Sequence, residues 1–257
     1  MHDSKVLQRI RGQQVAFGVT LHLRDTMLFE MTAGLGFDAI WLDLEHHNDG
    51  EPHATELIRA ARAGGQTDVV VRPAQGEFGH MARLLEAGAH GVMYPGCSSV
   101  DEAREVVRWA KFPPVGRRGF DGSNVDSGYM AYPMTEYLER ASTNTFIIIQ
   151  IEDPSSLPLV DDIARVEGVD RLMLGPADMS VRMGLAGQFD HPEVVGAQRR
   201  VAQAAKSAGK QWATTTMSME QLRQFREQGA GLIFHGADLV MVRQALLDLS
   251  GKLNELH

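Results

Sequence analysis

Two short segments decide the fold of this chain: Phe146-Ile-Ile-Ile-Gln-Ile-Glu152 and Arg171-Leu-Met-Leu-Gly-Pro-Ala-Asp-Met-Ser180. Each begins with an apolar, partly β-branched run, which is typical of a strand buried on both faces. A helix-like stretch at about 155–164 separates them, so the two strands should be parallel neighbours in one sheet. Polar residues follow each run, and the parallel arrangement brings Glu152 and Asp178 to the same end of the sheet.

The composition is that of an ordinary globular protein. Of the 257 residues, 44% are hydrophobic and 23% are charged, and this length suits one large α/β domain or two small ones. No boundary divides the sequence, so we predict a single domain over residues 1–257. A net charge of -8 argues against a nucleic-acid partner, because its phosphates would be repelled. The one cysteine, Cys97, excludes an internal disulfide and a zinc cluster built from cysteines. No apolar run reaches about 18 residues, so we expect no membrane span, no membrane partner and a cytoplasmic location.

The rest of the sequence repeats the same strand-then-helix unit. Six further apolar runs are predicted to be strands: 15–21, 39–43, 68–72, 91–95, 211–216 and 231–235. Helical spacing predicts helices at about 25–35, 52–63, 78–87, 100–110, 135–141, 191–208, 218–229 and 237–253, most of them ended by glycine. Only residues 112–132 break this rhythm. Eight such units predict a closed (β/α)8 barrel of the TIM type, with an open, doubly wound sheet as the alternative.

Glu152 and Asp178 form the strongest candidate pair for a functional site. Two facing carboxylates repel each other unless a positive charge lies between them. Oxygen ligands alone favour Mg²⁺ or Mn²⁺, with water and substrate completing the coordination. The alternative is that either residue caps a helix or forms a salt bridge, and Asp178 is well placed to cap a turn.

Residues next to this pair could receive a substrate. Gly175, Pro176 and Ala177 are expected to form a rigid turn whose free backbone N–H groups could bind a carboxylate, although Gly-Pro is also common in ordinary turns. Gln150 alternates with buried isoleucines and therefore shares a face with Glu152. Its amide is expected to hydrogen-bond a ligand such as a metal-bound water.

Further ionisable groups follow the second and third predicted strands. The Asp43-x-x-His46 spacing suggests a carboxylate that orients an imidazole, with a solvated loop histidine as the alternative. Glu45 is expected to point differently from Asp43, and the sequence leaves open whether His46 or His47 faces the site. Arg72 could stabilise negative charge on an oxygen or pair with an acid such as Glu45.

Five motifs in register carry a resemblance to a known family. They are Trp41-Leu-Asp-Leu-Glu-His46, Val70-Val-Arg-Pro73, Phe112-Pro-Pro-Val-Gly-Arg-Arg-Gly119, Gln150-Ile-Glu152 and Gly175-Pro-Ala-Asp178. Their order and spacing are similar to those of the HpcH/HpaI aldolases, which are class II, metal-dependent pyruvate aldolases of the phosphoenolpyruvate/pyruvate barrel superfamily. The resemblance covers about residues 15–249 and points to aldolases of the 4-hydroxy-2-oxoheptanedioate and 2-dehydro-3-deoxyglucarate kind.

The resemblance implies a role for each matching residue. Glu152 and Asp178 are expected to bind a divalent metal ion: Mg²⁺, Mn²⁺ or Co²⁺. Arg72 is expected to contact the keto or enolate oxygen. His46 is expected to be the acid/base, with Asp43 behind it.

The resemblance also implies where the substrate binds. Gln150 should contact substrate or water, and the 175–177 turn should receive the pyruvate carboxylate. Arg118 belongs to a Pro-Pro-x-Gly-x-Arg-Gly segment that resembles a mobile loop near the mouth of the barrel. The chain departs from the family at Thr20, where members often carry an aromatic residue, and Trp212, near the seventh strand, is the candidate to supply that bulk.

The expected function is the reversible aldol cleavage of a 4-hydroxy-2-oxo acid to pyruvate, or another 2-oxo acid, and an aldehyde, through a metal-stabilised enolate. No lysine sits at an obvious strand end, which disfavours a Schiff-base route. One alternative is a citrate-lyase-like enzyme acting on acyl-CoA thioesters, but this acidic chain offers no obvious basic patch for CoA. Another is a non-catalytic barrel that binds an organic acid.

The resemblance implies a homo-oligomer. Family members are typically hexamers in which the last helix is exchanged between partners. The amphipathic helix predicted at 237–253 fits that role, and it would equally fit an ordinary barrel helix.

Overall fold

Eight parallel strands close into a barrel in the order β1 to β8, with β1 also paired to β8. The computed structural model describes residues 2–48 and 50–256. The strands are β1 (Ala16–Leu21), β2 (Ala39–Asp43), β3 (Asp68–Arg72), β4 (Gly91–Tyr94), β5 (Phe146–Ile151), β6 (Arg171–Leu174), β7 (Gln211–Thr216) and β8 (Ala230–Ala237). The predicted (β/α)8 fold is therefore confirmed, and the open-sheet alternative is excluded.

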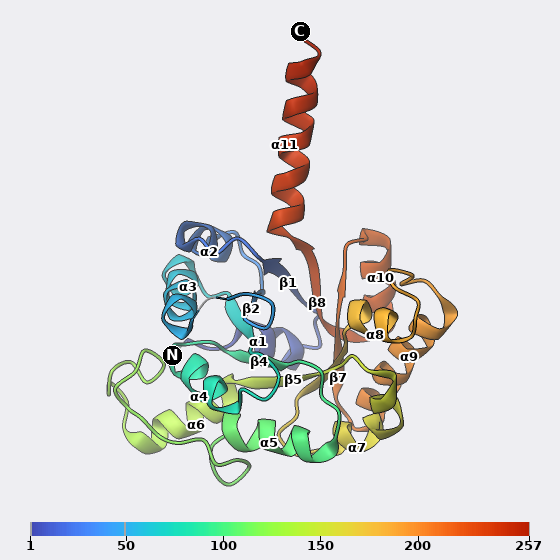
Figure 1. The fold of residues 1–257 in the computed structure, drawn as a ribbon. Helices are drawn as coiled ribbons and strands as arrows, with labels where there is room; N and C mark the ends of the chain where they lie inside the picture. Colours follow the sequence, from blue (N-terminus) through green and yellow to red (C-terminus); the bar gives the residue numbers. More distant parts are fainter. Residues whose placement is uncertain (1, 49, 257) are drawn as a thin grey trace.

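Helices follow the strands and surround the barrel (Figure 1). They are α1 (Lys5–Arg11), α2 (Thr26–Gly34), α3 (Glu51–Gly64), α4 (Phe78–Glu86), α5 (Val100–Ala110), α6 (Met134–Asn144), α7 (Val160–Arg165), α8 (Pro176–Arg182), α9 (Pro192–Ser207), α10 (Met219–Glu227) and α11 (Asp238–Asn254). Within the described ranges, none of the helices combines the length and the apolar character needed to cross a bilayer.

Two parts of the chain differ from the helices expected on sequence. The stretch at about 155–164 is divided into a 3₁₀ helix, η1 (Pro154–Leu159), and then α7. Pro158 lies inside η1 and has no N–H to donate to a continuous α-helix. The segment after β6, expected as a turn, begins the short helix α8, with Pro176 at a favourable position in its first turn.

Side chains alternate in direction along each strand and so divide the buried apolar residues into two cores. In β5, Phe146 and Ile148 belong to the core inside the barrel, whereas the intervening isoleucines pack between the strands and the helices. Successive side chains of a strand point to opposite faces. Gln150 and Glu152 therefore continue the inward-facing row past the end of the packed interior, where they reach the carboxyl-terminal rim.

Helix α1 closes the opposite, amino-terminal end of the barrel. Val6 is fully buried in the interior core, and Leu7 and Ile10 pack against the same core. The Asp68 carboxylate, at the start of β3, accepts hydrogen bonds from the backbone N–H groups of Lys5 and Val6. Because α1 fills this end, the carboxyl-terminal rim is where the barrel can admit a substrate.

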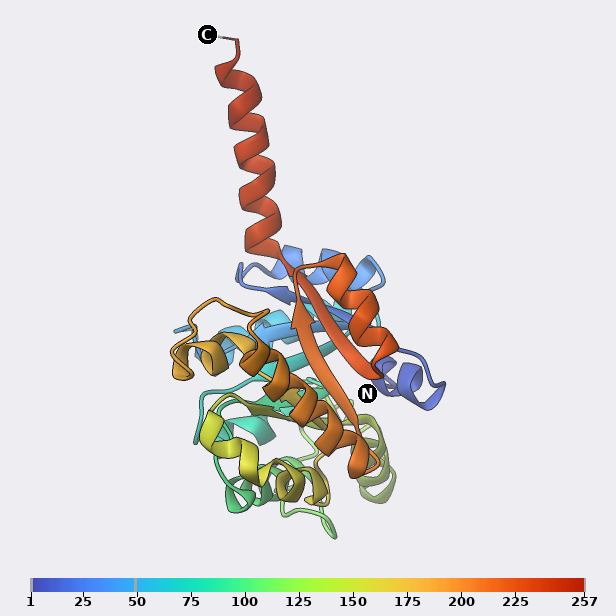
Figure 2. The same cartoon turned by 90° about the vertical axis from the view of Figure 1, so that its right-hand side faces the viewer.

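The last helix, α11, projects away from the barrel (Figures 1 and 2). Its apolar side chains are accordingly exposed: Leu239, Val240, Met241, Val242, Leu246, Leu247, Leu249 and Leu253. The sequence allowed either an ordinary barrel helix or an exchanged one. The structure shows that α11 does not cover its own barrel.

Candidate active site

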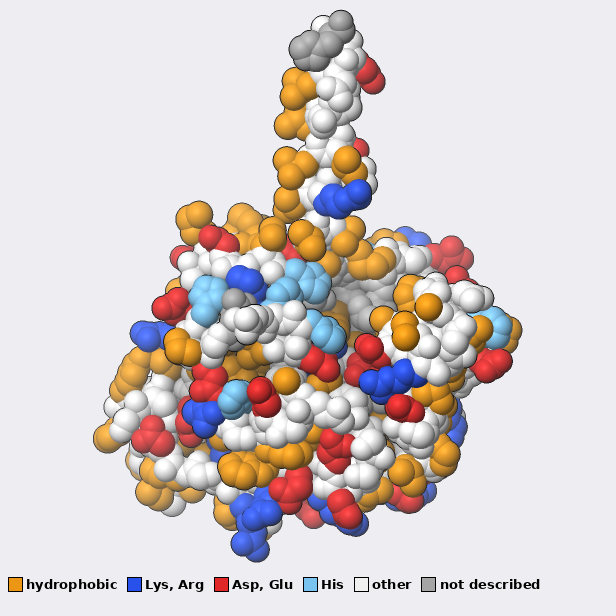
Figure 3. All heavy atoms as spheres, viewed as in Figure 1, with side chains coloured by type: hydrophobic (Ala, Val, Ile, Leu, Met, Phe, Trp, Pro, Cys, Tyr) orange, Lys and Arg blue, Asp and Glu red, His pale blue; other side chains and the backbone are white. Residues whose placement is uncertain are grey.

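The carboxyl-terminal rim gathers charged side chains from β2, β3, β5 and the turn after β6. In the space-filling view, acidic and histidine side chains surround a hollow below the base of α11 (Figure 3). Asp43 and Arg72 are direct neighbours in the β2–β3 ladder. Leu174, the last residue of β6, pairs with Ile151, so Glu152 lies beside the turn that leads into α8. The rim is where barrels of this architecture carry out chemistry.

Arg72 is held in one orientation by Asp43. Its Nε and Nη2 atoms donate to the two carboxylate oxygens of Asp43 at 2.8 and 2.7 Å, and the guanidinium lies 4.8 Å above the Trp41 ring. Burial alone would lower the pKa of Arg72, but Asp43 and Glu45 raise it. Burial alone would raise the pKa of Asp43, but the bonds from Arg72 lower it. Both groups therefore stay charged, as a bidentate pair of fixed geometry.

Glu45 is turned toward the same cation. Its Oε2 lies 3.2 Å from Arg72 Nη1 and 3.8 Å from His46 Nε2. The expectation that Glu45 points differently from Asp43 is wrong, because residues i and i+2 of extended chain share a face. The predicted contact between Asp43 and the His46 imidazole is not made. Asp43 is occupied by Arg72 and by the backbone N–H of Glu45.

Glu152 is the most perturbed acid of the rim. It is 3% exposed, and its Oε2 accepts a hydrogen bond of 2.9 Å from the backbone N–H of Gly96, which follows β4. Burial raises the pKa of Glu152 to about 7; Arg72 opposes the shift, whereas Glu45 and Asp178 add to it. A carboxylate in this position is stabilised by any additional positive charge.

Gly175 makes room for the Glu152 carboxylate. A Cβ at position 175 would lie 2.5 Å from Cγ and 2.7 Å from Cδ of Glu152, and closer still to Oε1. Any side chain here would therefore displace the acid. The turn also carries Asp178, in the first turn of α8, whose charge raises the pKa of Glu152.

The predicted carboxylate-binding turn offers fewer donors than expected. The Gly175 N–H is used by the carbonyl of Ile151 at 3.1 Å, and Pro176 has no N–H. Of the three predicted residues, Ala177 keeps an N–H without an intrahelical acceptor, because it lies in the first turn of α8.

Gln150 faces the barrel interior beneath Glu152, as its alternation predicts. It is 1% exposed, and its Oε1 has no hydrogen-bond partner among the described residues. A buried amide oxygen without a partner is costly. A bound water or substrate hydroxyl would satisfy it.

This barrel, with its rim of Arg72 and four acids, belongs to a known family. The model of the family described as HpcH/HpaI aldolase/citrate lyase matches residues 17–245. The chain is a member of the HpcH/HpaI aldolase/citrate lyase family. The resemblance inferred from the five motifs is thereby confirmed.

Relatives of this HpcH/HpaI family member include named aldolases. A hydroxypyruvate/pyruvate aldolase of Pseudomonas aeruginosa is 33% identical, over 95% of this chain and 91% of that protein. A 4-hydroxy-2-oxo-heptane-1,7-dioate aldolase of Shigella sonnei is 32% identical, over 95% of this chain and 92% of that protein. The crystal structure of an HpcH/HpaI aldolase from Desulfitobacterium hafniense DCB-2 superposes with a TM-score of 0.91 and 29% identity, covering 97% of this chain and 96% of that one.

Two residues predicted to line the site, Arg118 and Trp212, lie away from the rim. Arg118 is buried beside α6, 4.7 Å over the Phe112 ring and 3.5 Å from the Tyr137 hydroxyl. Trp212 is the second residue of β7 and faces outward, edge-on to Phe225 of α10. Neither side chain is brought to the rim of its own barrel. In both cases the sequence identified the segment but not the direction of the side chain.

Other rim residues were not assigned on sequence. Gly96 supplies the N–H to Glu152, and its φ of +57° favours glycine at that corner. His22 Nδ1 lies 3.3 Å from His47 Nε2, and the His22 backbone N–H bonds Asp238 at the base of α11. The available signals were the Pro-Gly pair after the fourth strand and the unusual Thr20-x-His22 on the first.

Proposed function

We propose that this family member is a metal-dependent aldolase that cleaves a 4-hydroxy-2-oxo acid to pyruvate, or another 2-oxo acid, and an aldehyde. One observation carries the proposal: Arg72, clamped by Asp43, faces the half-buried acid Glu45 and the buried acid Glu152 on the rim of this family's barrel. Such a rim presents the fixed positive charge of Arg72 and a cluster of carboxylate oxygens whose negative charge Arg72 balances only in part. The names of the relatives support the same reaction.

Glu152 and Asp178 are the residues that would hold the metal ion. The carboxyl of Glu152 is buried close enough to Asp178 and Glu45 for their charges to raise its pKa, so a divalent cation would relieve the repulsion. The donor set consists of oxygens and fits Mg²⁺, Mn²⁺ or Co²⁺ with water completing the coordination. When bound, such an ion acts as a Lewis acid toward a keto oxygen.

Arg72 and Ala177 would orient the keto acid. The Arg72 guanidinium cannot lose its proton and is locked by Asp43, so it provides fixed positive charge beside the oxygen that becomes negative in the enolate. The Ala177 N–H, at the start of α8, is suited to the substrate carboxylate. The unpartnered Gln150 Oε1 would accept a hydrogen bond from a bound water or hydroxyl.

His46 would move the protons. Its side chain is 59% exposed and lies next to Glu45, at the open edge where the aldehyde part of the substrate would sit. In the cleavage direction, His46, directly or through a water, takes the proton of the C4 hydroxyl while the C3–C4 bond breaks. The aldehyde leaves, and the enolate of pyruvate takes up a proton at C3.

The test is pyruvate release from a 4-hydroxy-2-oxo acid, followed with lactate dehydrogenase and NADH. We expect EDTA to abolish the release and Mg²⁺ or Mn²⁺ to restore it. Glu152→Ala should lose both the metal ion of the rim and the activity. A protein that binds the acid without releasing pyruvate would contradict the aldolase assignment, and cleavage of an acyl-CoA thioester instead would favour a lyase of the citrate-lyase kind.

We also propose that the chain forms a homo-oligomer in which α11 is exchanged between copies, a hexamer by resemblance. The apolar face of α11 has no partner among the described residues of its own barrel. Other exposed apolar side chains lie on α2 and at the start of α10: Met27, Met31, Leu35, Met217 and Met219. Exposed apolar surface of this extent marks an interface, and an α11 from a second copy would cover it.

A further inference from the structure

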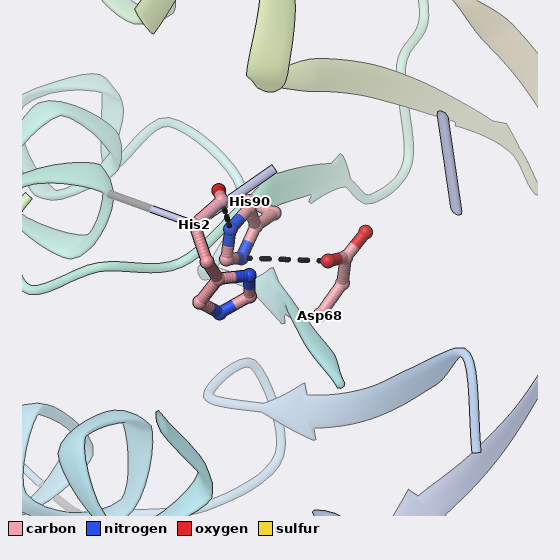
Figure 4. A group of neighbouring side chains, drawn as sticks. All are labelled: His2, Asp68 and His90. Atoms are coloured by element: carbon pink, nitrogen blue, oxygen red, sulfur yellow. Dashed lines mark hydrogen bonds and ion pairs between the residues drawn. The ribbon is translucent and has the colours of Figure 1, made fainter. Parts of the chain in front are cut away.

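Three ionisable side chains meet at the amino-terminal end of the barrel, opposite the rim. His2 precedes α1, Asp68 begins β3, and His90 lies just before β4. One ligand atom of each lies within 4.8 Å of the other two. Asp68 and His90 are buried at 0% and 2% exposure, and His2 is half-buried. Figure 4 shows the His90 ring between the carbonyl of His2 and the carboxylate of Asp68.

Each imidazole has one engaged nitrogen and one orphaned nitrogen. His90 Nε2 lies 3.3 Å from the His2 carbonyl oxygen, and His2 Nδ1 lies 3.3 Å from the Asp3 carbonyl oxygen. A carbonyl oxygen can only accept, so these nitrogens carry the protons and donate. The lone pairs then lie on His90 Nδ1 and His2 Nε2, which are buried and have no hydrogen-bond partner among the described residues.

This is the arrangement found in histidines that bind metals. A ligating imidazole almost always donates its other N–H to a carbonyl or carboxylate, which fixes the tautomer and the ring orientation. Here two imidazoles are fixed in that way, with their rings 4.3 Å apart. Two unpartnered, buried nitrogens are otherwise difficult to explain.

Asp68 supplies the third, anionic ligand. Its Oδ2 accepts from the Ser4 hydroxyl and the Val6 N–H, and its Oδ1 accepts from the Lys5 N–H at 3.0 Å. Oδ1 keeps a second lone pair, and it lies 3.7 Å from His90 Nδ1. That separation is too long for a hydrogen bond but close to the ligand–ligand spacing around a tetrahedral ion, about 3.4 Å for bonds of about 2.0–2.1 Å.

We propose that His2, Asp68 and His90 form a structural site for Zn²⁺ or a similar borderline divalent ion, with water as the fourth ligand. Two imidazole nitrogens and one carboxylate suit Zn²⁺, whereas the oxygen-only rim suits Mg²⁺ or Mn²⁺. The ion would tie the segment before α1 to the floor of the barrel. His2 lies outside every helix and strand, so its side chain can approach the other two ligands without moving a strand.

Groups of both charges surround the cluster. Burial lowers the pKa of both imidazoles to about 4, and the nearby Arg62 guanidinium adds to the effect. Burial raises the pKa of Asp68 to about 6, which leaves it ionised at neutral pH. The carboxylates of Asp68 and Asp3 offset the guanidinium of Arg62.

The test separates this site from the rim. Glu152→Gln/Asp178→Asn removes the two proposed metal ligands of the rim in the full-length chain, prepared without an affinity tag, and Co²⁺ or Zn²⁺ alone is the probe. We expect one equivalent of Co²⁺ with the intense visible absorption of four-coordinate cobalt, and a rise in Tm of several degrees with Zn²⁺. Adding His2→Gln should abolish both effects without unfolding the protein, because His2 lies outside every helix and strand.

His191→Asn is the matched control. It removes an imidazole from the start of α9, and asparagine preserves the cap that His191 makes with the Glu193 N–H. This variant should bind Co²⁺ like its parent. The proposal is overturned if the rim-neutralised protein binds no Co²⁺, or if binding survives His2→Gln. The aldolase assignment is tested separately, since His2→Gln in the otherwise native chain should retain full turnover.

Discussion

Gly175→Ala tests whether turnover and metal affinity depend on the position of the Glu152 carboxylate. Gly175 has φ of -88° and ψ of 94°, which alanine can adopt, so the substitution acts through contact and not through backbone strain. The new methyl group would meet Glu152 Cγ at 2.5 Å, whereas ordinary contact begins at 3.4 Å. The side chain must therefore shift by about 0.9 Å, which disturbs the hydrogen bond that its carboxylate accepts from the Gly96 N–H.

A displacement of about 1 Å in a catalytic group costs on the order of 10²-fold in rate. We expect kcat to fall by about that factor, and the affinity for Mn²⁺, measured by electron paramagnetic resonance, to fall with it. Gly196→Ala is the control: position 196 lies in α9 with nothing within 4 Å of the added carbon, and activity should not change.

Gly175→Ala combined with Glu152→Asp provides the rescue. Aspartate is one methylene shorter, so the acid can withdraw from the new methyl group, and part of the Mn²⁺ affinity should return relative to Gly175→Ala alone. Circular dichroism melts establish that each variant is folded. Wild-type kcat and wild-type Mn²⁺ affinity in Gly175→Ala would refute the reasoning, because the carboxylate would then not need this space.

Three further predictions follow from the same geometry. His46→Ala should lose about 10²–10⁴-fold in kcat while keeping its metal content, since the imidazole transfers protons and is not a ligand; loss of metal would contradict this. Burial raises the pKa of Glu152 to about 7 from 4.5, so the folded chain holds a proton there that the unfolded chain has released. The Tm of the metal-free protein should therefore fall as the pH rises from 4.5 to about 7, and it should fall less in Glu152→Gln. An equal fall of Tm with pH in the two proteins would refute the raised pKa of Glu152. Leu246→Glu, on the exposed apolar face of α11, should reduce the assembly in light scattering, whereas Arg243→Glu on the same helix should have a smaller effect; an unchanged mass for Leu246→Glu would exclude α11 from the interface.

Local sequence was sufficient for most of the barrel. The bounds of β2, β3, β7 and α5 agree with those expected, because polar, glycine, proline or capping residues interrupt the apolar pattern at their ends. The parallel pairing of β5 and β6 followed from the helical segment between them. The placement of Glu152 and Asp178 at the same end of the sheet thus followed from the sequence alone.

Contacts between distant elements could not be predicted in this way. The register and tilt of neighbouring strands decide these contacts, and no local pattern encodes them. Examples are the bidentate pair of Arg72 with Asp43, the hydrogen bond from the Gly96 N–H to Glu152, and the space that Gly175 leaves for Glu152. The outward direction of Trp212 has the same origin, since one position along a strand exchanges the two faces.

The surroundings of His2 and α11 show most clearly what the local sequence leaves undetermined. The sequence predicts an amphipathic last helix, but only the tertiary structure shows that α11 leaves its own barrel with its apolar face exposed. His2, Asp68 and His90 are far apart in sequence and meet because α1 closes the barrel floor. Periodicity and capping are local properties and can be read from the chain, whereas the juxtaposition of side chains is a property of the closed barrel.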